Sequence, residues 1–279
     1  MRLKHNTYGK ANVQVLKVFR DGDRHLVREI AVSVRVEGEL DGNYTDADNR
    51  SCVPTDTIKN TVFVLAKSHF TESLAAFAVT VSSHFLRRYD HLRRVTVRVE
   101  ESPWNRMRVD GEEHDHSFLR SECGREFART DASDEGMGVW CGVRGLTVLK
   151  STGSGFENFH KCELTTLQPT NDRILATTME GEWRFASREV NFDEQNRRVM
   201  DSLLRRFAGE YSPSVQRTLF RMGEAALESA GDVDEITLKM PNEHYFLFDL
   251  AAFDLENDNE IFYPSKAPFG DIEATVSRT

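Results

Sequence analysis

The stretch Val32-Ser33-Val34-Arg35-Val36-Glu37 alternates apolar and polar side chains. A period of two residues is typical of a strand that buries one face. An earlier run carries Val13, Val15 and Val18, and the turn sequence Asp21-Gly22-Asp23 lies between the two runs. Because such a turn favours a hairpin, we expect the chain to begin with two antiparallel strands.

The hydrophobic period then changes. Thr55-Asp56 supplies a helix N-cap before Ile58, Val62 and Leu65. Residues 74–89 place apolar side chains at spacings of three and four, which predicts a second amphipathic helix. Alternation returns in residues 95–99, and we expect a last strand over residues 117–129. The first half therefore has the predicted order ββααββ.

The second half predicts the same order after a polar boundary at residues 130–136. Asn191 and an acid three residues later form a capping-box variant before a helix whose apolar positions are Phe192, Val199, Met200, Leu203, Leu204 and Phe207. The other predicted elements are strands over 139–150 and 174–185, a helix over 214–230, and strands over 236–250 and 260–276. We predict an α+β fold with two modules, residues 1–131 and 132–279. Open antiparallel sheets leave unpaired edges, which favours oligomerisation.

Composition excludes several classes of protein. The chain has 279 residues, 36 Lys+Arg and 45 Asp+Glu, a net charge of −9, and 39% hydrophobic residues. That balance is typical of a folded protein and argues against a general nucleic-acid binder, which needs a basic face. No apolar run approaches the ~20 residues of a membrane-spanning helix. The N-terminus has no signal-peptide pattern and the cysteines form no CxxC pair, so we expect reduced thiols and a cytoplasmic location.

Two local motifs invite a chemical interpretation. His114-Asp115-His116 places two imidazoles on one face of a strand, as a metal site requires, but no third ligand lies nearby in the sequence. Ser151-Thr152-Gly153-Ser154-Gly155-Phe156 is rich in glycine, yet it lacks both the Walker ending and the dinucleotide-binding glycine spacing. We therefore interpret the histidines as surface or edge residues, and the glycine-rich stretch as a flexible loop that presents Phe156.

Short motifs along nearly the whole chain together resemble one family, the urate oxidases (uricases). They are Tyr8-Gly9-Lys10-Ala11, Thr55-Asp56-Thr57-Ile58-Lys59-Asn60-Thr61, Val148-Leu149-Lys150-Ser151-Thr152, Phe156, Thr165-Thr166-Leu167, Asp172-Arg173-Ile174-Leu175-Ala176-Thr177, Ser214-Val215-Gln216 and Pro241-Asn242-Glu243-His244-Tyr245-Phe246. The resemblance implies the tunnelling fold (T-fold), with two ββααββ modules per subunit in a homotetramer. The chain ends without a peroxisomal signal, which favours a bacterial-type enzyme.

The resemblance also implies a reaction: the oxidation of urate by dioxygen and water, without a cofactor or metal, to 5-hydroxyisourate and hydrogen peroxide on the route to allantoin. Matching motif positions imply a proton relay of Lys10, Thr55 and His244. They imply that the substrate is bound by Thr55, Asp56, Phe156, Arg173, Val215, Gln216 and Asn242, with Asn242 holding dioxygen or water above the ring. Thr55 and Asp56 would come from the neighbouring subunit.

Two other interpretations stay open at this point. One is a different tunnelling-fold enzyme that acts on a purine or pterin, with a metal at His114 and His116. The other is a non-catalytic purine-binding protein, which would keep Arg173, Gln216 and Phe156 but would not need the three relay residues together.

Overall fold

The computed structural model describes residues 1–71 and 73–278, so Thr279, the last residue of the predicted second module, lies outside the described residues. The chain divides into two compact units. The first comprises Met1–Gly142 and Arg184–Asp193, and the second comprises Val143–Trp183 and Glu194–Thr279. The predicted module boundary between residues 131 and 132 falls within a strand, Arg125–Ser133. A division into two repeated modules at that point stays a prediction.

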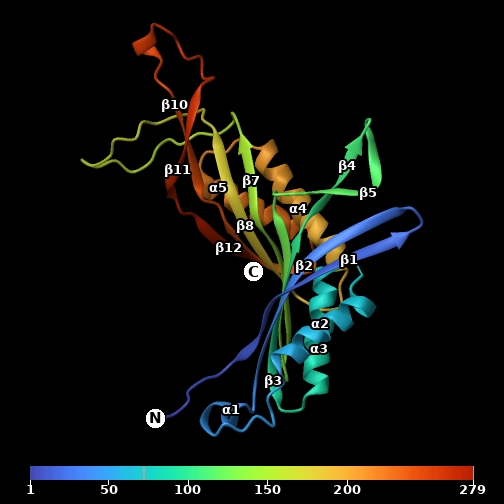
Figure 1. Cartoon of the computed structure of the whole chain (residues 1–279). Helices are drawn as coiled ribbons and strands as arrows, with labels where there is room; N and C mark the ends of the chain where they lie inside the picture. The colour runs from blue at the N-terminus through green and yellow to red at the C-terminus, as the bar shows by residue number, and fades with distance from the viewer. Residues whose placement is uncertain (72, 279) are drawn as a thin grey trace. The chain divides into compact units, whose positions relative to one another are not determined.

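The first unit is built on antiparallel strands in the order β1-β2-β3-β6, as the alternating runs predict (Figure 1). Val32, Val34 and Val36 are fully buried, which confirms the alternation that predicts β2. Each fully buried valine contributes about 1.5–3 kcal/mol relative to an exposed one. The strands are β1 (Tyr8–Asp21), β2 (Arg24–Gly38), β3 (Leu92–Ser102) and β6 (Arg125–Ser133), followed by β7 (Gly136–Lys150).

A β-bulge interrupts β1 between Lys10 and Val13, where Asn12 has a φ of 59°. Before the bulge Lys10 lies opposite Val34, and after it Val13 lies opposite Val32. Residues directly opposite each other in an antiparallel pair point to the same face. The bulge therefore places Lys10 on the same face as Val13, which is the face that buries the β2 valines.

Helices α2 (Thr55–His69) and α3 (Leu74–Arg88) lie side by side on this sheet, with α2 against β1 and α3 against β3 and β6 (Figure 1). A short helix, α1 (Asp41–Thr45), precedes them. The predicted N-cap of α2 is wrong in one detail. Pro54 occupies that position and its carbonyl accepts from Ile58, so Thr55 and Asp56 are the first two helical residues. Proline is suited to a helix entry because its φ is fixed and it needs no N–H partner.

The predicted strand over residues 117–129 is also wrong. Two strands of a separate hairpin, β4 (Trp104–Val109) and β5 (Glu112–Arg120), precede β6, and the chain turns at residues 121–124. The hairpin turn is Asp110-Gly111, where both residues have positive φ, 52° and 87°. Such a turn matches the twist of the flanking strands and requires residues that tolerate positive φ. The hairpin is anchored on β2 by the Trp104 indole N–H, which donates to Glu29 at 2.9 Å.

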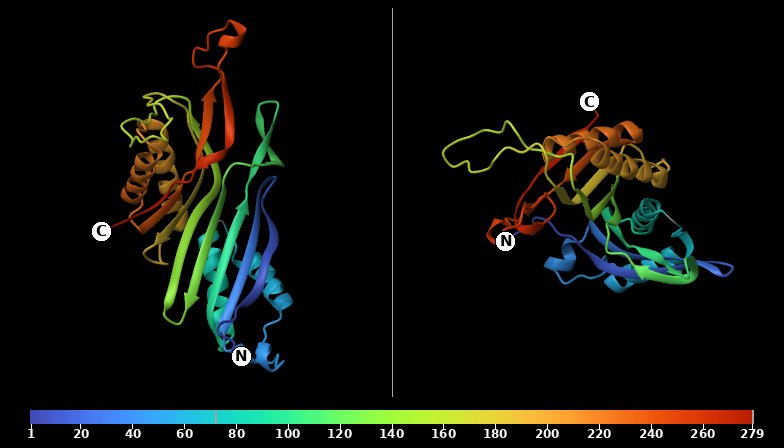
Figure 2. Two further views of the ribbon diagram at one scale, coloured as in Figure 1. Left: turned by 90° about the vertical axis from the view of Figure 1, so that its left-hand side faces the viewer. Right: turned by 90° about the horizontal axis from the view of Figure 1, so that it is seen from above.

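The second unit contains the end of β7 and most of β8, followed by two helices and the strands at the end of the described chain. Helices α4 and α5 lie side by side in the views of Figure 2, and the Ser229 hydroxyl of α5 contacts that of Ser202 in α4 at 3.1 Å. α5 packs on β9 and β12. The elements are β8 (Leu175–Phe185), α4 (Phe192–Gly209), α5 (Val215–Ser229), β9 (Val233–Lys239), β10 (Asn242–Leu247), the 3-10 turn η1 (Ala251–Phe253), β11 (Phe262–Gly270) and β12 (Glu273–Ser277).

Two predictions for this unit need correction. The two long terminal strands are four shorter ones, β9 to β12. Pro241 separates β9 from β10, because proline cannot donate to a sheet ladder. On α4, Val199 and Leu203 are fully buried as predicted, but Leu204 is 39% exposed and lies at the margin of the apolar stripe.

Across residues 1–71 and 73–278, no helix combines the length and apolar character needed to cross a membrane.

Candidate functional site

A pocket of about 520 Å³ in the second unit brings together six of the predicted site residues. It lies between a loop that precedes β8, the start of α5 and the strand β10. The predicted residues in its lining are Phe156, Arg173, Val215, Gln216, Asn242 and His244. Their sequence positions span almost ninety residues, so the fold and not sequence proximity gathers them.

The loop that carries Phe156 and Arg173 is fixed by backbone hydrogen bonds. Gly155 N–H donates to the Ser212 carbonyl at 2.8 Å, and Ser212 N–H donates to the Gly153 carbonyl at 2.9 Å. Phe156 N–H donates to the Thr170 carbonyl at 2.7 Å. A side chain at Gly155 would not fit, because an added Cβ would lie 2.2 Å from the Tyr211 hydroxyl oxygen. The glycine-rich stretch is thus an ordered support for Phe156, and the prediction of a flexible loop is wrong because these backbone hydrogen bonds fix it.

Arg173 is held next to Phe156. Its backbone N–H donates to the Ser154 carbonyl at 2.8 Å, and its guanidinium carbon lies 5.5 Å from the centre of the Phe156 ring. Burial lowers the pKa of Arg173, but the group remains charged at any physiological pH. Among the described residues the Arg173 Nε atom is buried without a hydrogen-bond partner. A buried donor costs free energy until an acceptor occupies the pocket.

The first turn of α5 forms the opposite side of the pocket. Ser214 is the N-cap, and its side chain accepts from the Arg217 N–H at 3.1 Å. Val215 and Gln216 follow as the first two helical residues. The first N–H groups of a helix have no partner within it and carry a partial positive charge. Together with Arg173, they favour an anionic occupant.

β10 supplies Asn242 and His244, which lie on either side of an irregularity in the pairing with β11. His244 is half-buried and pairs with Ser265, and its ring centre lies 5.6 Å from that of Phe246. Glu243, the residue between Asn242 and His244, accepts a 2.6 Å hydrogen bond from the Thr178 hydroxyl of β8. This anchor holds the start of β10 at the pocket.

The remaining three predicted residues, Lys10, Thr55 and Asp56, belong to the first unit. Lys10 is half-buried on β1, and Thr55 and Asp56 are exposed in the first turn of α2. The pKa of Asp56 is lowered, chiefly by a hydrogen bond from Lys59 and to a smaller extent by the charge of Lys10. The Lys10 ammonium therefore lies within electrostatic reach of the start of α2.

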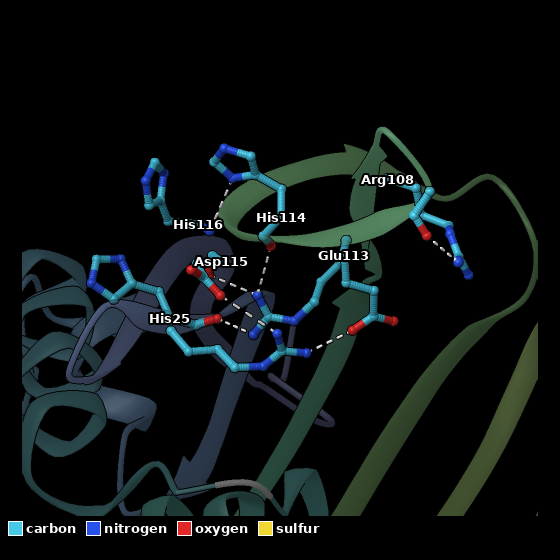
Figure 3. A network of polar contacts seen from close by, with 9 residues as sticks. His25, Arg108, Glu113, His114, Asp115 and His116 are labelled. Atoms are coloured by element: carbon cyan, nitrogen blue, oxygen red, sulfur yellow. Dashed lines mark hydrogen bonds and ion pairs between the residues drawn. The ribbon is translucent and has the colours of Figure 1, made fainter.

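The His114-Asp115-His116 motif lies on β5, away from all of these residues in the sequence. Figure 3 shows the three residues of the motif close together on this strand. The His116 backbone N–H donates to His114 Nδ1 at 3.3 Å, and Arg106 donates to the Asp115 carbonyl at 2.7 Å. The His114 and His116 rings meet edge to face, 4.6 Å apart. Within residues 1–71 and 73–278, no group of three or more His, Cys, Asp or Glu side chains is arranged to hold a metal ion.

Sequence reasoning missed several residues that line the pocket, such as Thr170, or that support its loop from outside the lining, such as Tyr211 and Asp172. Thr170 pairs with Phe156 through two backbone hydrogen bonds, and Tyr211 supports the loop by donating to the Asn171 carbonyl at 3.0 Å. Asp172 accepts from the Thr152 hydroxyl at 2.8 Å and so closes the same loop. Asp172 directly precedes Arg173 in the motif of residues 172–177, so the sequence contained a signal that could have identified it. The other pocket-lining residues are Leu167, Ile174, Glu243, Tyr245, Phe246 and Ile272.

Comparison with known proteins identifies the family. The sequence profile of the Uricase family matches residues 6–129 and 139–273, which is most of the chain. The chain belongs to the uricase family. The uricase of Cyberlindnera jadinii is 42% identical, with 99% of this chain and 97% of the relative covered, and that of Oryctolagus cuniculus is 40% identical, with 97% and 93% covered. At this identity and coverage, the protein is an enzyme, a urate oxidase.

Solved uricase structures agree with the fold. The uricase of Arthrobacter globiformis has a TM-score of 0.93 and 38% identity, covering all of this chain and 95% of that one. The urate oxidase of Bacillus sp. TB-90 has a TM-score of 0.86 at 20% identity, covering 98% of this chain and 100% of that one, and it supports the fold alone. The predicted α+β tunnelling fold and family membership are confirmed.

Proposed function

We propose that this urate oxidase uses no cofactor and converts urate, dioxygen and water to 5-hydroxyisourate and hydrogen peroxide. The observation that carries the proposal is the pairing of the Phe156 ring with the Arg173 guanidinium in one pocket, 5.5 Å apart, with Arg173 Nε buried and unpartnered among the described residues. An aromatic face suits a planar ring, and a guanidinium fork suits its anionic carbonyl edge. Urate offers both.

In this proposal the other pocket residues complete the binding of urate. Gln216 shares the polar edge of the purine with Arg173, and the Val215 N–H at the α5 start donates to it. Asn242 holds dioxygen or water above the ring. Thr55 and Asp56 of a neighbouring subunit offer the N–H groups of the α2 start to the opposite edge.

The main task of the protein in this reaction is to remove and return protons, because the electrons pass from urate to dioxygen. Urate loses two electrons and dioxygen gains them, a bond forms between water oxygen and the ring carbon C5, and the protons released accompany the peroxide. Electron loss is easier from urate that has lost protons. Lys10, Thr55 and His244 form the relay that removes and returns those protons, since side chains of these three types can pass a proton along a chain of hydrogen bonds.

We further propose a homotetramer whose active sites lie between subunits. The hairpin of β10 and β11 supports assembly, because it exposes several large apolar side chains, including Phe246 at 47% and Tyr263 at 53%. Mixing tests this. Thr55→Ala and Arg173→Gln subunits are refolded together in equal amounts. If each site takes Thr55 from one subunit and Arg173 from another, ~¼ of the sites are native after random mixing. Recovery no greater than the sum of the separate variants would refute shared sites.

A direct assay tests the reaction. Metal-free enzyme is mixed with urate, and the loss of urate absorbance, the uptake of dioxygen and the formation of peroxide are followed together. We expect equal molar amounts of all three, unchanged by a chelator. Activity that disappears with the chelator would instead favour a metal-dependent tunnelling-fold enzyme, and urate binding without dioxygen uptake would favour a binding protein.

A further inference from the structure

Tyr8 connects the strand that carries Lys10 to the helix that begins with Thr55. The Tyr8 hydroxyl oxygen accepts a hydrogen bond from the Val53 backbone N–H at 2.7 Å. Val53 is only 3% exposed, so this N–H has little access to water. Lys10 follows Tyr8 by two residues on β1, and Thr55 follows Val53 by two residues across Pro54. A single hydrogen bond thus joins the two segments close to both predicted relay residues.

The chemistry of the hydroxyl suits a permanent structural contact. Burial raises the pKa of Tyr8, and the neighbouring Cys52 thiol raises it further. The hydroxyl therefore keeps its proton. As a phenol it can accept the hydrogen bond from the Val53 N–H while it keeps its own proton.

The register of β1 places Tyr8 on the correct face. Tyr8 lies opposite the buried Val36, so it shares the helix-covered face with Lys10. At the other end of the same strand, Lys17 Nζ donates to the Ala66 carbonyl near the end of α2 at 2.9 Å. The strand therefore holds α2 at both of its ends, and Tyr8 is the anchor at the end that carries Thr55.

We propose that Tyr8 is a positioning residue for the reaction, whose hydroxyl fixes the first turn of α2 relative to Lys10. The inference rests on the proposed function, because it assigns Tyr8 its effect through Thr55 and Lys10. Displacement of a reacting group by about 1 Å costs on the order of 100-fold in rate, so the loss of one anchor that permits a smaller shift is expected to cost about tenfold.

The test is a double-mutant cycle of Tyr8→Phe with Thr55→Ala. Tyr8→Phe keeps the ring and removes only the hydroxyl. We expect kcat to fall about tenfold, equivalent to about 1.4 kcal/mol, in the otherwise native enzyme. In the Thr55→Ala background, where the hydroxyl to be positioned is absent, we expect a change of less than about twofold. A merely structural role would cost the same factor in both backgrounds, and that result would overturn the proposal.

Tyr44→Phe is the matched control. Tyr44 is half exposed, and its hydroxyl contacts the Thr7 carbonyl at 3.5 Å and not the segment before α2. We expect its kcat to equal that of the native enzyme, and a thermal melt verifies that each variant is folded. If Tyr8→Phe behaves like Tyr44→Phe, the positioning role is wrong. If Thr55→Ala itself keeps full turnover, the relay is wrong, and this outcome separates failure of the proposed function from failure of the Tyr8 inference.

Discussion

Replacement of Arg173 by lysine is the sharpest test of how the pocket binds an anion. The guanidinium lies 5.5 Å from the Phe156 ring centre, and its Nε atom is buried without a partner among the described residues. A guanidinium offers parallel donors to a planar anion, whereas an ammonium is a point charge. Arg173→Lys keeps the positive charge and removes the second donor of the fork, so the substitution measures the fork itself.

The expected loss follows from one hydrogen bond to a charged group, worth about 1.5–3 kcal/mol. That range corresponds to a dissociation constant for urate that rises about 10- to 150-fold. Calorimetry with urate in the absence of dioxygen measures binding without turnover. In the native enzyme without urate, Arg173 Nε is buried without a partner among the described residues, and binding of urate removes that cost. The lysine variant has no such cost to remove, so part of its loss of affinity arises in the unbound state.

Arg217→Lys controls for the loss of a guanidinium near the same helix start. The Arg217 guanidinium carbon lies 5.7 Å from the centre of the exposed Phe220 ring, and the residue does not line the pocket. We expect its urate affinity to stay within about twofold of the native value. An Arg173→Lys enzyme that binds urate as tightly as Arg217→Lys would refute the assignment of the fork to the substrate.

Three further outcomes are expected. Lys17→Met should lower the free energy of unfolding by about 1–2 kcal/mol in urea titrations, because Lys17 Nζ donates to carbonyls at the end of α2, while Lys67→Met at an exposed position of that turn should not. Gly155→Ala should weaken urate binding on the order of tenfold, because the new Cβ would lie 2.8 Å from the Thr170 carbonyl oxygen that pairs with Phe156; Gly209→Ala, with no atom within 4 Å, is the control. The hydrogen bond from the Thr165 hydroxyl lowers the pKa of Cys162, so Thr165→Val should raise that pKa, reduce the thiolate fraction and slow alkylation of Cys162 by iodoacetamide at about pH 7.5, which peptide mass spectrometry measures; an unchanged rate would contradict this.

Patterns in the sequence predict the parts of the fold that burial controls. The alternating valines of β2 and the apolar stripe of α3 are buried as expected, because periodicity records which face a segment buries. The hairpin of β4 and β5 was not predicted, although Asp110-Gly111 is a strong turn signal, because residues 104–120 lack a regular buried face. The split of the terminal strands at Pro241 was available from the sequence, since proline within a run argues against one continuous strand.

The site shows a different limit. Periodicity by itself identifies none of the pocket residues, since Phe156 and Arg173 lie in irregular backbone and Gln216 is exposed at a helix start. The resemblance to the family supplied them, and the geometry gathers six of the nine in one pocket of the second unit. Their roles in binding and proton transfer, the tetramer and the cytoplasmic location stay predictions.

Lys10 shows why neither source of information is sufficient alone. Strict alternation along β1 would place Lys10 on the face opposite to Val13 and Val15, because it lies an odd number of residues before each of them. The bulge at Asn12 adds one residue and reverses that parity, so Lys10 lies opposite Val34 on the helix-covered face. The family motif identifies Lys10 as a site residue, and the alternation predicts which face of β1 is buried. Only the bulge explains how Lys10 and the buried valines share one face. The bulge in β1 therefore directs the Lys10 side chain to the face that α2 covers. Without the bulge, Lys10 would point to the opposite face of the sheet.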